Sequence, residues 1–127
     1  MKELFFVGAG GMLGAILRYL IIKLPIFNLT FPINTFIVNI LGCFLVGVLL
    51  KYSSISNKEL SNMINNFMII GFCGGFTTFS AFSLDSINLL NEGKYLLFLS
   101  YMISSSIVGI IFCYIGCLLY TSDAADE

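Results

Sequence analysis

Residues 71–83 (GFCGGFTTFSAFS) combine the residue types with which membrane proteins handle ions. Three glycines, two adjacent threonines and two serines interrupt an apolar run. In lipid, each backbone N–H or C=O group freed from a helix costs on the order of several kcal/mol unless protein, water or an ion satisfies it. Channels and transporters use broken helices to present carbonyl oxygens to ions. The segment therefore predicts an ion-handling break inside a membrane helix.

The composition is that of an integral membrane protein. Of the 127 residues, 58% are hydrophobic and 10% are charged, whereas soluble domains carry about 25% charged residues. Runs of roughly 20 apolar residues, the length of a membrane span, cover residues 4–23, 31–50, 62–90 and 95–119. The third run is too long for one straight helix. We therefore predict an all-α integral membrane protein with four transmembrane helices, the third broken in mid-membrane.

The four runs leave no room for a second domain. Residues 1–120 are expected to form a single transmembrane domain, and the small, acidic residues 121–127 a disordered tail without function. The chain is expected to be a multi-pass protein of a cell inner membrane or plasma membrane. No nucleic-acid partner is expected.

Catalytic chemistry has few candidates in this sequence. The chain has no histidine, and every acidic residue except Asp85 lies at or near the end of an apolar run. General acid–base and nucleophilic catalysis both need paired groups that are missing, so an enzyme is not predicted. The four cysteines are expected to be small buried apolar residues rather than disulfide partners or metal ligands: Cys43, Cys73, Cys113 and Cys117.

The basic residues do not fix an orientation in the membrane. Four spans divide them three and three between the two sides: Lys2, Lys51 and Lys58 against Arg18, Lys23 and Lys94. Orientation normally follows the excess of Lys and Arg in short loops. Either folding or the tail decides orientation, or the chain inserts both ways and pairs as an antiparallel dimer, rebuilding the inverted symmetry of many transporters.

The first span carries a helix-packing face and one charge. Gly10 and Gly14 have the spacing that lets two helices approach closely in lipid, and packing is a sufficient explanation for them. A guanidinium in or near a span normally finds a carboxylate, a carbonyl or water. Arg18 therefore either extends to the membrane surface or draws anions toward a vestibule.

The second and fourth spans each have one polar stripe. Thr35, Asn39 and Gly42 share a face of the second span, where an asparagine either joins helices or donates N–H groups to an anion. Tyr101 and Ser105 share a face of the fourth span that continues through Gly109 to Cys113. Hydroxyls of this kind either bond their own helix backbone or present donors to a permeating anion.

The third span should restart as a helix near residues 77–79. Phe79 and Phe82 then share a face beside the break, with Ser80 on a neighbouring one. Phenyl rings have positively polarised edges, so two rings beside a break can line a path for a small anion. Asp85 would repel that anion if it pointed into the path, so we expect it nearer the membrane end, paired or capping.

Three segments together resemble the small fluoride channels of the Fluc or CrcB family. They are residues 10–19 (GGMLGAILRY), 35–42 (TFIVNILG) and 71–83, in the order of that family, and the resemblance covers about residues 3–119. The third segment is the specific one. The resemblance implies antiparallel, dual-topology homodimers in the lipid bilayer that export fluoride passively from the cytoplasm and so relieve its toxicity.

The resemblance also assigns residues. It implies a structural Na+ at the dimer interface, held by the backbone carbonyls of Gly74 and Thr77. It implies a fluoride pore and a vestibule formed by seven residues: Asn39, Phe79, Ser80, Phe82, Tyr101 and Ser105 in the pore, and Arg18 in the vestibule. Two positions depart from the family, because Ala81 replaces a common threonine and Gly109 a serine found in some members.

Two other functions fit a four-span chain. A proton-coupled exporter of small cations generally needs a carboxylate deep in a span, and Asp85 is the one candidate. A non-transporting membrane scaffold needs no such group. Ion flux from purified protein in liposomes separates both from a fluoride channel.

Overall fold

The computed structural model describes residues 1–25 and 30–125, with side chains up to residue 119. Its elements are α1 (Lys2–Lys23), α2 (Ile33–Ser54), α3 (Lys58–Met63), the π-helix η1 (Ile64–Cys73), α4 (Gly74–Phe76), α5 (Phe79–Asn91) and α6 (Tyr95–Ala125). Four helical stretches in the described ranges are long and apolar enough to cross a membrane: Lys2–Lys23, Ile33–Ser54, Lys58–Asn91 and Tyr95–Leu119. The prediction of four spans is confirmed.

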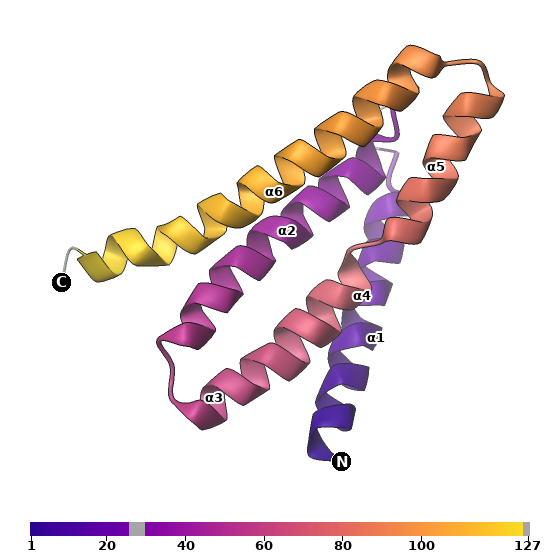
Figure 1. Ribbon diagram of the computed structural model, residues 1–127. Helices are drawn as coiled ribbons and strands as arrows, with labels where there is room; N and C mark the ends of the chain where they lie inside the picture. The colour runs from indigo at the N-terminus through magenta and orange to yellow at the C-terminus, as the bar shows by residue number, and fades with distance from the viewer. Residues whose placement is uncertain (26–29, 126–127) are drawn as a thin grey trace.

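The spans associate in two pairs (Figure 1). Helix α2 lies along α6, and α1 lies along the stretch from η1 to α4, while α5 lies beside the first part of α6. A Cβ atom at Gly10 or Gly14 of α1 would overlap the carbonyl oxygen of Phe67 or Phe72. The predicted packing face of the first span is therefore confirmed, because only glycine allows backbones to approach this closely.

Glycines also allow a close backbone contact between α2 and α6. A Cβ atom at Gly47 of α2 would overlap the Cys113 carbonyl, and one at Gly116 of α6 would overlap the Phe44 carbonyl. The core therefore holds few large side chains. Among the described residues the largest fully buried ones are Tyr101, Val38 and Cys73.

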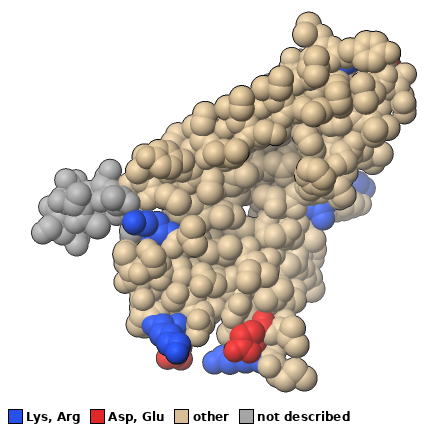
Figure 2. Space-filling view, in the orientation of Figure 1, with Lys and Arg blue, Asp and Glu red and all other residues tan. Residues whose placement is uncertain are grey.

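The surface is apolar over most of its area. Charged side chains form small patches, one of them at the end of the molecule that carries the N-terminus (Figure 2), where Lys2, Glu3 and Glu59 border one pocket. Large apolar side chains such as Leu4 and Leu96 are exposed along the helices. Such a surface requires lipid or a second protein surface around it.

Short polar motifs end the helices. The side-chain amide of Asn34 donates to the carbonyls of Ile22 (2.9 Å) and Leu24 (2.7 Å), which joins the end of α1 to the start of α2. Gly93 has a φ of 75° and forms a Schellman turn after α5, in which the Lys94 N–H donates to the Leu89 carbonyl at 2.9 Å. These motifs satisfy backbone carbonyls at the ends of α1 and α5.

Helix α6 is longer than the fourth apolar run. It continues to Ala125, through five residues of the segment for which the sequence predicts a disordered tail. Residues 126 and 127 lie outside the described residues, and the tail as a whole stays a prediction.

Candidate functional site

The backbone of the third span leaves the helical conformation at two threonines. Thr77 has ψ 156°, and Thr78 has φ −149° and ψ 112°, both extended, before α5 begins at Phe79. The sequence predicts a break within residues 71–83, where glycines precede the two threonines. Gly74 and Gly75 are helical, and a Cβ atom at Gly75 would overlap the Gly11 carbonyl of α1. Gly75 therefore packs directly against the α1 backbone while it remains helical.

Asn39 of α2 binds the interruption through its side-chain amide. Its Oδ1 accepts a hydrogen bond from the Thr78 N–H at 2.8 Å, and its Nδ2 donates to the Thr78 carbonyl at 3.2 Å. Both backbone groups of Thr78 are thus satisfied, and the second N–H of the amide is left over. Of the two roles that the sequence leaves open for Asn39, joining two helices is the one that the hydrogen bonds show.

Thr78 in turn starts α5. Its Oγ1 accepts from the Ala81 N–H at 3.0 Å, an N-cap bond that satisfies one of the free donors of the first turn. The Ser80 hydroxyl lies 3.1 Å from the same oxygen. Thr78 is not among the residues predicted from the sequence, although threonine directly before an apolar helix is a capping signal.

The polar stripe of α2 faces this region along its length. A Cβ atom at Gly42 would overlap the Thr77 side chain, so glycine is needed for the close approach. At the other end of the stripe, the buried Thr35 lies next to the Tyr101 hydroxyl. The stripe therefore contacts both the interruption and α6.

Arg18 reaches the same segment from α1. Its Nε donates to the Gly75 carbonyl oxygen at 3.0 Å, two residues before Thr77. A guanidinium at this position is expected to bind a carboxylate, a carbonyl or water, and Arg18 binds a carbonyl.

A groove of about 360 Å³ lies between α2, α5 and α6. Four of the residues predicted to line a pore border it: Asn39, Phe79, Phe82 and Ser105. Thr77 and Thr78 border it as well, so the interruption forms part of its wall. Ser80 and Tyr101 do not border the groove, and Arg18 and Gly74 also lie outside its wall.

The two phenylalanines form the aromatic part of the groove. Their ring centroids are 5.7 Å apart with planes inclined at 37°, which agrees with the expected shared face. Phe82 also lies 4.9 Å from the Tyr101 ring. Phe79 is 79% exposed, so one ring is packed in the protein and the other is open to its surroundings.

Tyr101 has a different partner from the one implied by a pore role. Its side chain is fully buried, and its hydroxyl donates to Asp85 Oδ2 at 3.2 Å. Asp85 is therefore paired, as one of the two expectations for it states, although it lies within α5 rather than at its end.

The serines of α6 divide into two kinds. Ser104 and Ser106 donate to the carbonyls of Ser100 and Met102 in their own helix. Ser105 and Ser106 both border the groove. Backbone bonding therefore accounts for two of these hydroxyls and leaves Ser105 available to a solute.

Two thiols also border the groove, Cys43 of α2 and Cys113 of α6. The sequence predicts both as small buried apolar residues, yet both side chains are half-buried. Helical spacing could have indicated their place in the groove. Cys43 lies one turn after Asn39 on α2, and Cys113 continues the stripe of Ser105 on α6.

Comparison with known proteins agrees with the resemblance. The family described as "CrcB-like protein, Camphor Resistance (CrcB)" matches residues 5–117. A protein of Azobacteroides pseudotrichonymphae named "Fluoride-specific ion channel FluC" is 41% identical over 122 residues, which are 94% of this chain and 96% of that protein. A protein of Phocaeicola vulgatus with the same name is 44% identical over 119 residues, 91% and 96% of the two chains. The Aquifex aeolicus protein of that name is 36% identical over 121 residues, 94% of this chain and 97% of the relative. With its four membrane-spanning helices and a match along nearly its whole length, this chain belongs to the CrcB family.

Proposed function

We propose that this chain is a passive, fluoride-selective channel that exports cytoplasmic fluoride and so relieves fluoride toxicity. The names of its relatives support the identity of the ion. The observation that carries the proposal is the groove in which Asn39, Ser105 and the Phe79–Phe82 pair lie beside the extended Thr77–Thr78 backbone.

The chemistry of the groove suits fluoride, a small and strongly hydrated anion that readily accepts hydrogen bonds. Burying an unpaired ion in a medium of low dielectric constant costs on the order of tens of kcal/mol by Born estimates. Three kinds of neutral donor are at hand to replace its water: the second N–H of Asn39, the Ser105 hydroxyl and the edges of the phenyl rings. Because these donors carry no full charge, they allow entry without trapping the ion.

Ser80 and Tyr101 have indirect positions in this scheme. The Ser80 hydroxyl bonds Thr78, and the Tyr101 ring supports Phe82 while its hydroxyl bonds Asp85. Direct contact of either side chain with fluoride stays a prediction of the family resemblance, as does a vestibule role for Arg18.

We further propose that two copies pair antiparallel around a structural Na+, held by the carbonyl oxygens of Gly74 and Thr77 from each copy. The residues fit such an ion. The Thr78 N–H, which in a continuous helix would bond the Gly74 carbonyl, donates to Asn39 instead. No hydrogen bond from a described residue reaches the Thr77 carbonyl. Gly74 is exposed, so its backbone can meet a second copy. Backbone carbonyls are ligands that ion-binding sites use for monovalent cations.

The balance of basic residues supports insertion in both orientations. The apolar surface supports a multi-pass protein embedded in the lipid bilayer of an inner or plasma membrane. Each antiparallel pair would contain two grooves, one from each copy.

Fluoride efflux from proteoliposomes tests the main proposal. Purified protein is expected to release fluoride and to retain chloride in the same vesicles. Equal release of both halides would remove the claim of selectivity, and no release of either would leave a scaffold as the better description.

Loss of proton-driven cation flux on D85N would favour the exporter that the sequence leaves open.

Two matched variants test the groove. N39D places a negative charge at the groove wall and is expected to abolish fluoride efflux, because an anion is repelled where a donor had been. N88D makes the same change at an exposed position on α5 and is expected to conduct as the unchanged protein does. Equal efflux from both variants would place the ion path elsewhere.

The cation and the dimer need their own measurements. Fluoride efflux is expected to fall when Na+ is replaced by a large organic cation, while radioactive Na+ itself does not cross. Cross-linking of single-cysteine variants in membranes is expected to join opposite ends of two copies. Parallel cross-links, or Na+ flux that follows fluoride, would overturn this part.

A further inference from the structure

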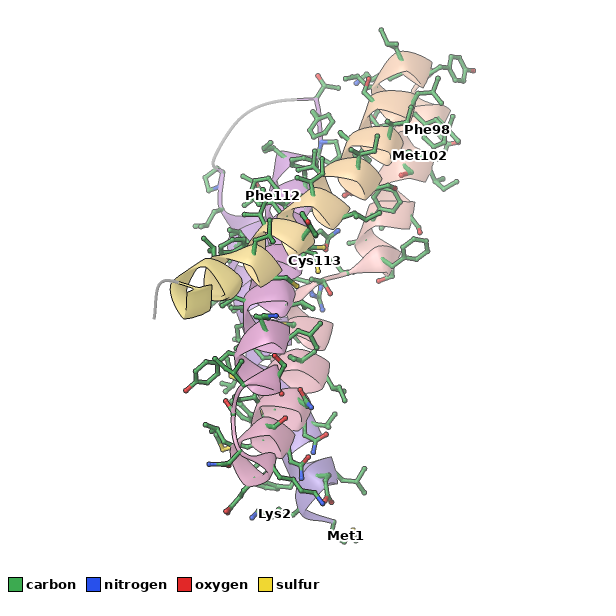
Figure 3. The ribbon with its side chains drawn as sticks, turned by 60° about the vertical axis from the view of Figure 1, so that its left-hand side comes forward. Met1, Lys2, Phe98, Met102, Phe112 and Cys113 are labelled. Carbon is green, nitrogen blue, oxygen red and sulfur yellow. The ribbon has the colours of Figure 1, made fainter. Side chains whose placement is uncertain are left out.

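One end of the groove is lined by sulfur instead of oxygen. Cys43 comes from α2 and Cys113 from α6, and both border the same cavity as Asn39 and Ser105. Figure 3 shows Cys113 on the part of α6 that crosses α2. Phe98 and Met102 lie closer to the start of the same helix.

Gly109 makes room for this arrangement. Ser105, Gly109 and Cys113 follow one another at single-turn spacing on α6, so the stripe has no side chain at its middle position. A Cβ atom there would lie 3.4 Å from the Cys43 sulfur. The Cys43 side chain therefore packs at the gap in the stripe, with Cys113 one turn beyond it.

The other two cysteines are placed differently. All four are free thiols, but Cys73 is buried with 1% exposure. Cys117 lies near Cys113 without bordering the groove. Cys43 and Cys113 are thus the pair that a solute in the groove meets.

We propose that Cys43 and Cys113 form a binding site for a soft monovalent cation of the class of Cu+ or Ag+, and that its binding blocks the groove. The effect on conduction rests on the proposed function, whereas the binding site does not. Soft thiol ligands select Cu+ over hard cations. The described residues contain no group of three or more His, Cys, Asp or Glu that could hold a metal ion, so ions such as Zn2+ that need four ligands are disfavoured.

The binding step balances without a change of oxidation state. The S–H bond of one cysteine breaks, its proton passes to water, and the sulfur forms a bond to the metal. The second cysteine coordinates through a lone pair and keeps its proton. One positive charge enters as another leaves, so the site gains no net charge, which avoids the cost of burying an ion in a low-dielectric region.

Native mass spectrometry of the protein in detergent tests the site with Ag+ as the probe. The unchanged protein is expected to gain one Ag+ per chain, and Cys43 and Cys113 are expected to become protected from N-ethylmaleimide. The double variant C43S/C113S is expected to lose both signals. C117S, altered one turn from Cys113, is expected to keep them.

Fluoride efflux measured in chloride-free nitrate buffer tests the block. Each protein is compared with its own rate before Ag+ is added. The unchanged protein and C117S are expected to lose efflux with Ag+, to recover it with dithiothreitol and to be unaffected by Zn2+. C43S/C113S is expected to keep its own untreated rate in Ag+.

The two readouts separate the two proposals. Absence of fluoride efflux before Ag+ is added would overturn the channel, while the mass shift would still report on the thiol site. Equal Ag+ binding by C43S/C113S, or loss of binding in C117S, would overturn the assignment to Cys43 and Cys113. Binding without inhibition of an active channel would overturn the block.

Discussion

Two regions of this molecule differ in how closely their backbones approach one another. Where α1 meets η1 and α4, glycines on both sides bring backbone against backbone, and Arg18 adds one bond to the Gly75 carbonyl. Between α2, α5 and α6, side chains of intermediate size leave a groove with amide, hydroxyl, thiol and aromatic groups on its wall. In the first region the glycines leave no space for a Cβ atom between the two backbones, whereas in the second region polar and aromatic side chains line an open groove.

The two regions therefore have different roles. Close backbone contact in lipid is stabilised by van der Waals packing and leaves no space for a solute. The groove contributes less packing but supplies hydrogen-bond donors. We therefore expect changes in the closed region to act on folding and changes in the groove to act on conduction, with Asn39 acting on both.

The largest effect is expected from G14L. The new side chain would meet the Phe72 carbonyl and the Phe76 N–H, and backbone atoms cannot move aside as a side chain can. We expect a loss of about 3 kcal/mol or more of folding stability, seen as aggregation on size-exclusion chromatography. G8L is the control, because nothing lies within 4 Å of the added atom. A well-folded G14L would show that the close contact is not needed.

The next largest effect is expected from N39A. It leaves the Thr78 N–H and carbonyl without their partners, at about 1–3 kcal/mol for each buried group. The melting temperature in detergent is expected to fall and fluoride efflux to fall with it. N88A on the exposed face of α5 should change neither. If N39A kept its stability but lost efflux, Asn39 would belong to the groove alone.

A smaller effect is expected from Y101F. The ring keeps its contact with Phe82, while the hydrogen bond to Asp85 is lost, a change of about 1 kcal/mol in stability. The comparison is with Y114F, at an exposed position on the same helix. Denaturation curves for the two variants measure the difference. A loss of fluoride efflux with no change in stability would mean that the hydroxyl itself contacts the ion.

The smallest effect on stability is expected from F79A. Phe79 is 79% exposed and Phe5 on α1 is 74% exposed, so F79A and F5A should each change folding stability by no more than about 0.5 kcal/mol. Fluoride efflux is expected to fall in F79A alone, because only that ring borders the groove. Equal efflux from both would remove Phe79 from the ion path.

Local sequence patterns were sufficient for the helices and their faces. Apolar runs of membrane length predicted four spans, and the spacing of Gly10 and Gly14 predicted a close helix contact, because both depend on residues near one another in the chain. The pairing of Phe79 with Phe82 follows from helical geometry in the same way. The order of the three motifs was enough to indicate the family.

The tertiary structure decided which partner each polar group has. Asn39 bonds a backbone that lies 39 residues away, so its two possible roles could not be separated from the sequence of α2. Gly75 packs against α1, both Gly74 and Gly75 are helical, and the interruption lies at the threonines, although glycine is locally the weaker helix former. Tyr101 turns to Asp85, and two cysteines reach the groove, because α2, α5 and α6 meet there. Helices follow from neighbours along the chain, whereas the groove depends on contacts between distant residues that only packing brings together.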